Sequence, residues 1–473
     1  MGTCIMTEAI DPRWAWEPYQ PSEQSPWDLK RVGHLYRRAS FGATWSELEQ
    51  GLQAGPGPTI DRLLKGDPPR GDFEEQTAEM ARSITRANNG QLARAWWLYR
   101  MLLSPHPLRE KLTLFWHNHF ATSNAKVNNA GFMLGQYELM NRHALGKFGT
   151  LLQEMSQDPA MMVWLDTSLS KKGMPNENYA RELMELFSLG IGHYTEHDVR
   201  EAARAFTGWE IQQGKAVFNS AQHDEGDKTV LKQNGNWTGA DIVRICLEQP
   251  ATPYFIAGKL YRFLISETVP ATPELLEPLA TQFRKSDFDF GALVETMLRS
   301  NLFFSPATYR TRVKPPVDFA LGIVRALEAR ASTTTLANAL QALGQDLFYP
   351  PSVKGWDGGA AWLNGQTLLF RQNWALTLCS SEDKDPRDGV RRPAAFLLAQ
   401  KYGKKTDAEL VDFFLRLLLQ DDVPSESRAR LLDYQEHAHK LAIPVYWTEH
   451  DAAEHRVRTL CHLVLTLPEY QLE

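Results

Sequence analysis

The stretch MPNENYARELMELFSLGIGHYTEHDVREAARAFTGW, residues 174–209, contains the clearest helical patterning and the densest polar chemistry of the chain. Apolar residues recur in it with a helical period on both sides of a short turn at 190–194, which contains glycine. Two helices joined by so short a connection lie near-antiparallel. Similar amphipathic patterns fill most of the remaining chain, and alternating strand patterns are almost absent. The sequence therefore predicts an all-α fold.

The length of the chain predicts more than one structural unit. A chain of 473 residues is too long for a single small core. We expect a large multi-helix domain at 28–380, preceded by a Pro- and Trp-rich arm at 1–27 that packs onto it, and followed by a helical subdomain at 393–473. A small β-hairpin or irregular insertion is expected at 216–238. Residues 346–374 are rich in Pro, Gly and Trp and are expected to form an ordered strap across the core.

The composition is that of an ordinary globular protein, with 43% hydrophobic and 23% charged residues. A net charge of -6 argues against a general surface for nucleic acid or anionic membranes. The four cysteines are scattered without a CxxC pair, which signals neither a disulfide framework nor a thiolate zinc site. The first residues lack the pattern of a secretory signal, and no run of 18 apolar residues predicts a membrane span. We therefore expect reduced thiols and a cytoplasmic location.

The first helix of the opening stretch carries a charged face. At 100° per residue, Asn178, Glu182 and Glu185 share this face, and Arg181 lies beside it. Two buried carboxylates three residues apart could bind a divalent cation or divide the roles of general acid and base. The alternative is a solvated face on which Arg181 pairs with a glutamate, and periodicity alone favours this alternative. Glu177 fits ordinary capping in the first turn.

The second helix of the stretch begins with a capping signal. Thr195 and Asp198 have the spacing of a capping box, with Asp in place of the usual Glu. Gly208 is a suitable end. Antiparallel packing of the two helices would bring Glu201 or Arg204 close to the charged face of the first helix.

Two further motifs are rich in possible ligands. The loop HDEGDK at 223–228 offers His223, Asp224 and Lys228 to a metal or a phosphate, and the alternative is an Asx-type turn with a surface ion pair. The run WHNHF at 116–120 looks like a metal-binding HxH. Residues two apart on a helix point about 200° apart, so His117 and His119 cannot both bind one ion there. Either the helix ends before His117 or a single histidine serves the site, and a core histidine bonded to the backbone is the alternative.

These motifs together resemble a large bacterial family, the domain of unknown function 1800. The resemblance rests on RRASFGAT (37–44), LTLFWHNHFATS (112–123), DPAMMVWLD (158–166), residues 176–209, HDEGDK (223–228), IAGKLYRF (256–263) and LFYPPSVKGWDGGAAW (347–362). It implies that the recurring polar positions form one shared site. These positions are Arg38, His117, His119, Asp166, Asn176, Glu177, Asn178, Arg181, Glu182, Glu185, Asp198, Arg204, Trp209, His223, Asp224, Lys228 and Arg371.

The resemblance also has implications for partners and for two other histidines. Members of the family are often encoded beside a second, sulfatase-like family, the domain of unknown function 1501, which makes a working partnership plausible. His193 and His197 fall where the family pattern usually has other polar residues, so we do not count them as ligands.

The leading hypothesis is an all-α enzyme with a buried polar site between the 108–120 helix and the 176–209 helix pair. A divalent metal (Zn, Mn or Fe) would be held by some of His117, His119, Glu182, Glu185 and His223. The residues expected to act on an anionic or polar substrate, by hydrolysis or oxidation, are Glu177, Arg181, Glu182, Arg204, Asp224 and Lys228. The competing hypothesis is a non-catalytic scaffold for a partner protein, in which the same residues form a structural network.

Overall fold

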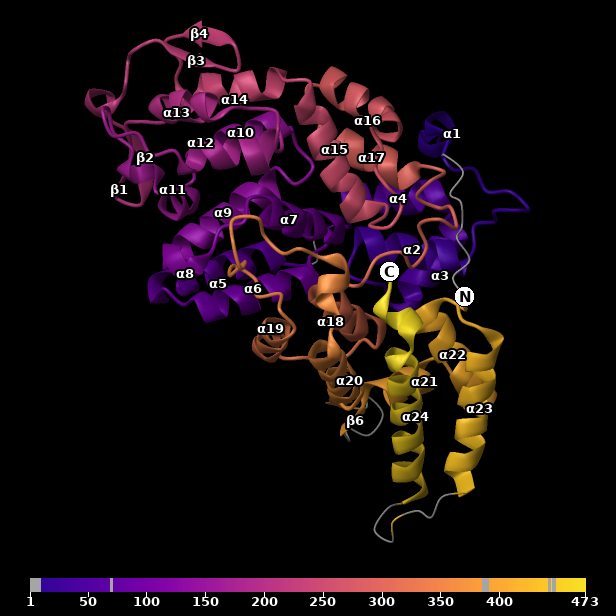
Figure 1. Cartoon of the computed structure of the whole chain (residues 1–473). Coiled ribbons are helices and arrows are strands. Elements are labelled where there is room, and N and C mark those ends of the chain that lie inside the picture. The colour runs from indigo at the N-terminus through magenta and orange to yellow at the C-terminus, as the bar shows by residue number, and fades with distance from the viewer. Residues whose placement is uncertain (1–9, 69–70, 385–390, 441–443, 445–447) are drawn as a thin grey trace.

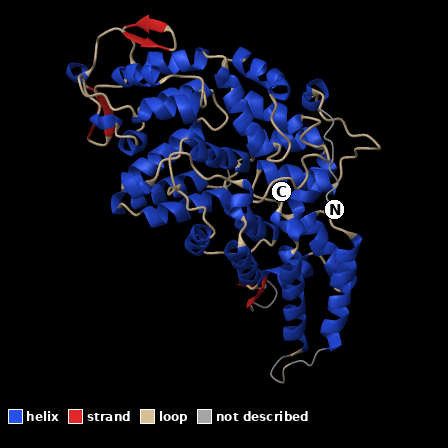
Figure 2. Cartoon of the chain, in the orientation of Figure 1, coloured by secondary structure: helices blue, strands red, loops and turns tan. Residues whose placement is uncertain are grey.

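Amphipathic helices form most of the chain, as the periodicity predicts (Figure 2). The computed structural model describes residues 10–68, 71–384, 391–440, 444 and 448–473. Within these residues, strands occur only in small two-stranded antiparallel sheets. None of the described helices combines the length and the apolar character that crossing a membrane requires. The prediction of an all-α fold with small hairpin insertions is confirmed.

The described part of the N-terminal arm, residues 10–27, packs onto the body. The indole N–H of Trp16 donates to the carbonyl of Leu275 at 2.7 Å, and the N–H of Tyr19 donates to the carbonyl of Arg299 at 2.7 Å. Helix α5 was not expected, because the segment at 70–92 is polar and only a narrow stripe of it is buried. The first elements are α1 (Pro12–Trp16), α2 (Leu29–Ala39), α3 (Trp45–Ala54), α4 (Pro56–Lys65), α5 (Phe73–Ala87) and α6 (Gly90–Leu103).

Helix α7 (Pro107–His119) is buried around nearly its whole circumference, which is unusual for a helix that carries charged residues. Its Lys111 ammonium is fully buried and donates to the carboxylate of Asp318. The helix does not end before His117, so the two histidines of WHNHF do point to different sides. The helices that follow are α8 (Asn124–Val127), α9 (Ala130–Arg142), α10 (Phe148–Met155) and α11 (Pro159–Trp164), with a 3-10 turn η1 (Thr167–Leu169).

The opening stretch forms the expected helix pair. Helix α12 (Asn178–Glu182) continues directly into a π-helix, η2 (Leu183–Ser188), and α13 (Glu196–Ala205) follows the turn. The capping box of Thr195 and Asp198 is confirmed, with the Asp198 carboxylate accepting the Thr195 N–H at 2.9 Å. The insertion expected at 216–238 begins earlier, at Trp209, and is two hairpins. These are β1 (Trp209–Gln212) with β2 (Lys215–Phe218) and β3 (Lys228–Val230) with β4 (Gln233–Gly235), separated by a 3-10 turn η3 (Ser220–Gln222).

The second half of the body is a series of helices followed by the strap. The helices are α14 (Gly239–Glu248), α15 (Ala251–Leu264), α16 (Pro273–Lys285), α17 (Phe290–Arg299), α18 (Pro316–Ala326) and α19 (Thr333–Ala342). The strap is an ordered loop over 343–358, ending in a 3-10 turn η4 (Gly359–Trp362). The expectation of a loop as far as residue 374 was wrong. Helix α20 (Gly365–Cys379) begins at Gly365, where the side chain of Asn364 caps it. Its apolar residues lie on all sides, which hides the helical period.

The C-terminal helices form a lobe from which α23 and α24 extend away from the body (Figure 1). Its elements are β5 (Glu382–Lys384), β6 (Arg391–Pro393), α21 (Ala394–Lys401), α22 (Asp407–Leu419), α23 (Ser425–Lys440), α24 (Glu449–Thr466) and η5 (Pro468–Gln471). Helix α22 packs on α2 and α18, and one hydrophobic cluster runs through body and lobe. The lobe therefore shares its core with the body.

The buried ion pair of Lys111 and Asp318 yields a first prediction. In Lys111→Met the carboxylate of Asp318 stays buried without its cation, and we expect the free energy of unfolding to fall by about 3–5 kcal/mol. The double variant Lys111→Met with Asp318→Leu should recover most of this loss, because it removes the stranded charge. Urea denaturation measures both. The matched control is Lys147→Met, which breaks an exposed pair with Asp287 and should cost less than about 1 kcal/mol.

Candidate functional site

The end of the α12–η2 helix leaves its last backbone carbonyls without a helical donor, and those of Leu186 and Phe187 are among them. The N–H groups of Leu189 and Gly190 both donate to the carbonyl of Met184, at 2.9 and 3.0 Å. Gly190 then turns the chain away with φ +85°. The carbonyls of Leu186 and Phe187 therefore need donors from elsewhere in the fold.

His119 of α7 supplies one of these donors. Its Nε2 lies 3.1 Å from the carbonyl oxygen of Phe187, and since a carbonyl can only accept, Nε2 carries the proton. Its Nδ1 is then a lone pair, which accepts from the ammonium of Lys259 at 3.1 Å. Burial and the charge of Lys259 hold the pKa of His119 well below its usual value. His119 is therefore a neutral imidazole with both ring nitrogens engaged.

Lys259 of α15 supplies the second donor. Its ammonium donates to the carbonyl of Leu186 at 2.9 Å in addition to His119. Burial lowers the pKa of Lys259 to about 8. Lys259 belongs to the IAGKLYRF run, but the sequence prediction did not include it among the site residues. The available signal was a lysine within an otherwise apolar helical turn.

His117 lies on the other side of α7, in an aromatic cage. Its Nε2 accepts the N–H of Phe348 at 3.1 Å, and the rings of Trp97 and Trp356 lie 5.2 and 5.6 Å from its own. The proton is therefore on Nδ1, which has no hydrogen-bond partner among the described residues. Burial lowers the pKa of His117 to about 3. This histidine holds the strap against α7.

A pocket of about 320 Å³ opens beside His119 and Lys259. Cationic, acidic and aromatic side chains line it together with Asn118 and His119. The cations are Lys259, Arg262, Arg312 and Lys354, the acids are Glu267, Asp318 and Asp357, and the aromatic residues are Phe115, Phe263, Trp356 and Trp362. The pocket thus combines apolar walls with several convergent charges, as small-molecule sites do.

The strap forms one wall of this pocket and is fixed to α7. The side-chain carbonyl of Asn118 accepts the N–H of Trp356 at 2.7 Å. Gly355 makes the approach possible, because its φ is +79° and a Cβ there would lie 2.2 Å from that oxygen. Trp356 is thereby placed at the pocket.

The charged face of α12–η2 is largely engaged in pairs. Arg181 donates to Glu196 at 2.6 and 2.8 Å and to Glu177 at 3.2 Å, so the surface-pairing alternative describes it. Glu185 accepts from the hydroxyl of Tyr194 at 2.5 Å. Burial and the nearby Glu185 raise the pKa of Glu182, while Arg181 and Lys354 of the strap oppose this shift.

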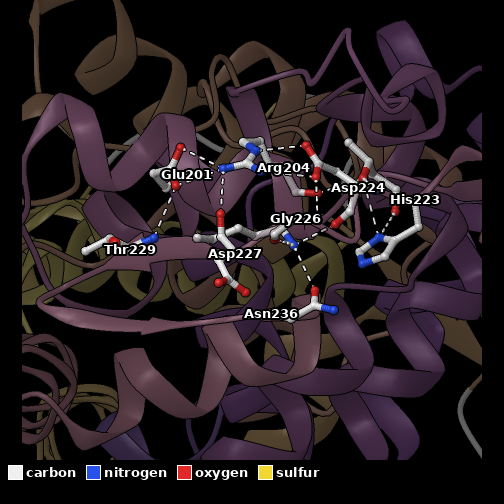
Figure 3. A network of polar contacts seen from close by, with 10 residues as sticks. Glu201, Arg204, His223, Asp224, Gly226, Asp227, Thr229 and Asn236 are labelled. Carbon is white, nitrogen blue, oxygen red and sulfur yellow. Dashed lines mark hydrogen bonds and ion pairs between the residues drawn. The ribbon is translucent and has the colours of Figure 1, made fainter.

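The HDEGDK loop is tied to α13 rather than to the pocket. Figure 3 shows Arg204 between the carboxylates of Asp224 and Glu201. Its guanidinium donates to Asp224 at 2.8 and 3.1 Å, to Glu201 at 2.9 and 3.1 Å, and to the carbonyl of Asp227 at 3.0 Å. The hydrogen bond from Arg204 is the main cause that lowers the pKa of Asp224 to about 2. These contacts use every nitrogen of Arg204.

Lys228 and His223 complete this network. The ammonium of Lys228 donates to the carbonyls of Asp224 and Gly226 at 2.6 and 2.9 Å and lies 3.4 Å from the side-chain oxygen of Asn236. Nδ1 of His223 donates to the carbonyl of Thr207 at 2.9 Å. The predicted residues of this loop are therefore joined to one another and not to His119 or Glu182.

The three predicted histidine ligands lie in three separate surroundings. His119 is at the pocket, His117 is in its aromatic cage, and His223 is beside α13. Within the described part of the chain, no three His, Cys, Asp or Glu side chains are grouped so that they could hold a metal ion. The lone pairs of His117 and His119 already accept hydrogen bonds. The predicted divalent metal stays a prediction.

Comparison with known proteins places most of the chain in one family. A family model described as "Protein of unknown function (DUF1800)" matches residues 34–472. Searches of curated proteins and of solved structures gave no match.

The two arginines of the opening stretch yield a second prediction. In Arg204→Met the partly buried carboxylates of Asp224 and Glu201 lose their shared cation, and we expect the free energy of unfolding to fall by about 1–3 kcal/mol. Arg181→Met, the matched control, breaks a more exposed pair and should cost less than about 1 kcal/mol. Urea denaturation compares the two variants. If the free energy of unfolding falls no more in Arg204→Met than in Arg181→Met, the loop does not depend on Arg204.

Proposed function

Since the chain belongs to the DUF1800 family, whose function is unknown, we propose a function from the pocket itself: it binds a small anionic organic molecule, and Lys259 acts on that molecule as a proton acceptor. The reaction we propose is hydrolysis. The observation that carries the proposal is the environment of the Lys259 amine, which is held by two acceptors, has a lowered pKa and lines the pocket.

The charges around the pocket support an anionic ligand. Two of the inner acids already have cations, since Glu267 lies 3.5 Å from Arg312 and Asp318 pairs with Lys111. Arg262 and Lys354 are exposed at the rim. The pocket thus has three cations, Lys259, Arg262 and Lys354, against one remaining acid, Asp357. Convergent cations beside low-dielectric aromatic walls attract and orient an anion.

The hydrogen bonds of Lys259 leave one position of its amine for chemistry. Leu186 and His119 each accept one N–H, and the third position carries either a proton or a lone pair. With a pKa of about 8, roughly a tenth of the amine is neutral at pH 7. A lysine tuned in this way by burial is a suitable general base.

The proposed step is proton transfer from water. The neutral amine of Lys259 takes a proton from a water molecule, whose oxygen attacks an electrophilic carbon or phosphorus of the bound anion. The resulting ammonium then donates to the developing negative charge or to the leaving group. His119 does not exchange protons in this scheme. It is a positioning residue, because its fixed tautomer directs the amine.

The third prediction concerns the pH dependence of binding. As the pH rises through about 8, Lys259 loses its charge, and the affinity for anions should fall. Lys259→Met should abolish the pH dependence and weaken binding about tenfold or more, as expected for a lost charged contact. Lys259→Arg should retain binding at all pH values while losing about 100- to 10,000-fold in hydrolysis. Calorimetric titration with phosphate, sulfate and small carboxylates, and hydrolysis of nitrophenyl phosphates and esters, measure these effects.

Lys215→Met is the matched control, because Lys215 is exposed on β2. It should behave like the unaltered protein in both assays. Anion binding that is unchanged in Lys259→Met would contradict the proposal, and so would hydrolysis that survives in Lys259→Arg.

A non-catalytic scaffold is the second candidate, and one observation favours it. His119, Lys259, Arg204 and Lys228 each satisfy backbone carbonyls, which is a structural task in itself. In this case the partner would be the sulfatase-like protein expected from the resemblance. The Lys259→Arg protein separates the candidates, since a scaffold would keep its partner binding and show no hydrolysis before or after the change.

The fourth prediction tests the divalent metal expected from the sequence. The lone pair on Nδ1 of His119 accepts a hydrogen bond from Lys259, so this ring is not a ligand of any Zn, Mn or Fe that the protein binds. Elemental analysis of the purified protein should therefore give the same metal content for the unaltered chain and for folded His119→Ala. The parallel variant Glu182→Ala tests the carboxylate. A stoichiometric metal that disappears in folded His119→Ala would contradict the hydrogen bonds assigned to this ring.

A further inference from the structure

Two of the buried cysteines lie side by side although they are far apart in the sequence. Cys379 is the last residue of α20, and Cys461 lies within α24. Their Sγ atoms are 3.5 Å apart, and both side chains are fully buried. In sequence they are 82 residues apart, which explains why their spacing gave no signal.

Although the scattered cysteines of the sequence predict reduced thiols, we propose that Cys379 and Cys461 form an intrachain disulfide that fixes α24, and with it the C-terminal lobe, to α20. An S–S bond is about 2.05 Å long, so each sulfur has to move by only about 0.7 Å. Rotation about the side-chain bonds supplies a movement of this size. The two helices already pack against each other, which keeps the two cysteines together.

Metal binding explains the pair less well than a disulfide does. A thiolate metal site needs three or four ligands, and the described residues offer no third His, Cys, Asp or Glu beside these two. Passive packing of two small apolar side chains is the remaining alternative. Refolding the protein in an oxidant distinguishes passive packing from a disulfide, because only a disulfide removes the two free thiols.

The reaction requires an oxidant of the disulfide class, such as oxidised glutathione. One cysteine thiolate attacks the glutathione disulfide and releases a reduced glutathione. The second cysteine then attacks the mixed disulfide and releases another. Two S–H bonds are lost and one S–S bond forms, and the two electrons and two protons reduce the oxidant to two thiols.

Burial controls when this reaction can occur. Burial and the neighbouring Cys379 raise the pKa of Cys461, which disfavours the reactive thiolate in the folded chain. We therefore expect oxidation to be slow in the folded protein and fast while the lobe is unfolded. The same burial protects the finished bond from reductants.

The experiment uses the full chain with Cys4→Ser and Cys246→Ser, so that only the pair remains. Cys246 lies in α14 and belongs to neither helix of the pair, so its replacement leaves α20 and α24 unaltered. The protein is unfolded in reductant and refolded with either reduced or oxidised glutathione. Free thiols are then titrated in denaturant, and the thermal midpoint is measured.

We expect no free thiol after oxidative refolding and a peptide that joins residues 379 and 461. We also expect a midpoint several degrees Celsius higher than in the reduced protein, because the bond closes a loop of about 80 residues in the unfolded chain. Cys379→Ala with Cys461→Ala cannot form the bond and should show no difference between the two refolding conditions. Two free thiols after oxidative refolding would overturn the proposal, as would glutathione left attached to each cysteine.

Discussion

The centre of this fold depends on two backbone carbonyls that their own helix cannot satisfy. A buried carbonyl without a donor costs about 1–3 kcal/mol, so the end of α12–η2 requires partners. Lys259 satisfies Leu186 and His119 satisfies Phe187, which joins α15 and α7 to the same point. The bond from Lys259 to His119 closes the arrangement. The tautomer of the histidine and the direction of the amine both follow from this one requirement.

The same principle explains how α7 can be buried on nearly all sides. Three of its polar residues meet groups from outside the helix: Lys111 meets Asp318 of α18, while His117 and Asn118 meet the strap backbone at Phe348 and Trp356. These contacts are distributed around the helix. The helix therefore determines where the strap and α18 lie, and the pocket is the space that remains between them.

The sequence predicts local features well and long-range pairing poorly. The helix pair, its capping box and the hairpin insertion follow from residues within a few positions of one another, and all are present. Helix α5 escaped prediction because only a narrow stripe of it is buried, and α20 because its apolar residues surround it. Of the candidate site, His119 was predicted. Its partner Lys259 lies 140 residues away, and no periodicity links such positions.

A structural and a catalytic role for Lys259 do not exclude each other. A lysine that only capped a helix end would be most stable with its ammonium exposed to water, where its charge is solvated. Here the ammonium lies where burial lowers its pKa to about 8, and it lines a pocket that also contains Arg262 and Lys354. The structural role of Lys259 uses two N–H groups, one for the Leu186 carbonyl and one for His119, and both the neutral amine and the ammonium have them. The proton that distinguishes the two states is therefore the one that capping does not need, and it is the one available to a ligand.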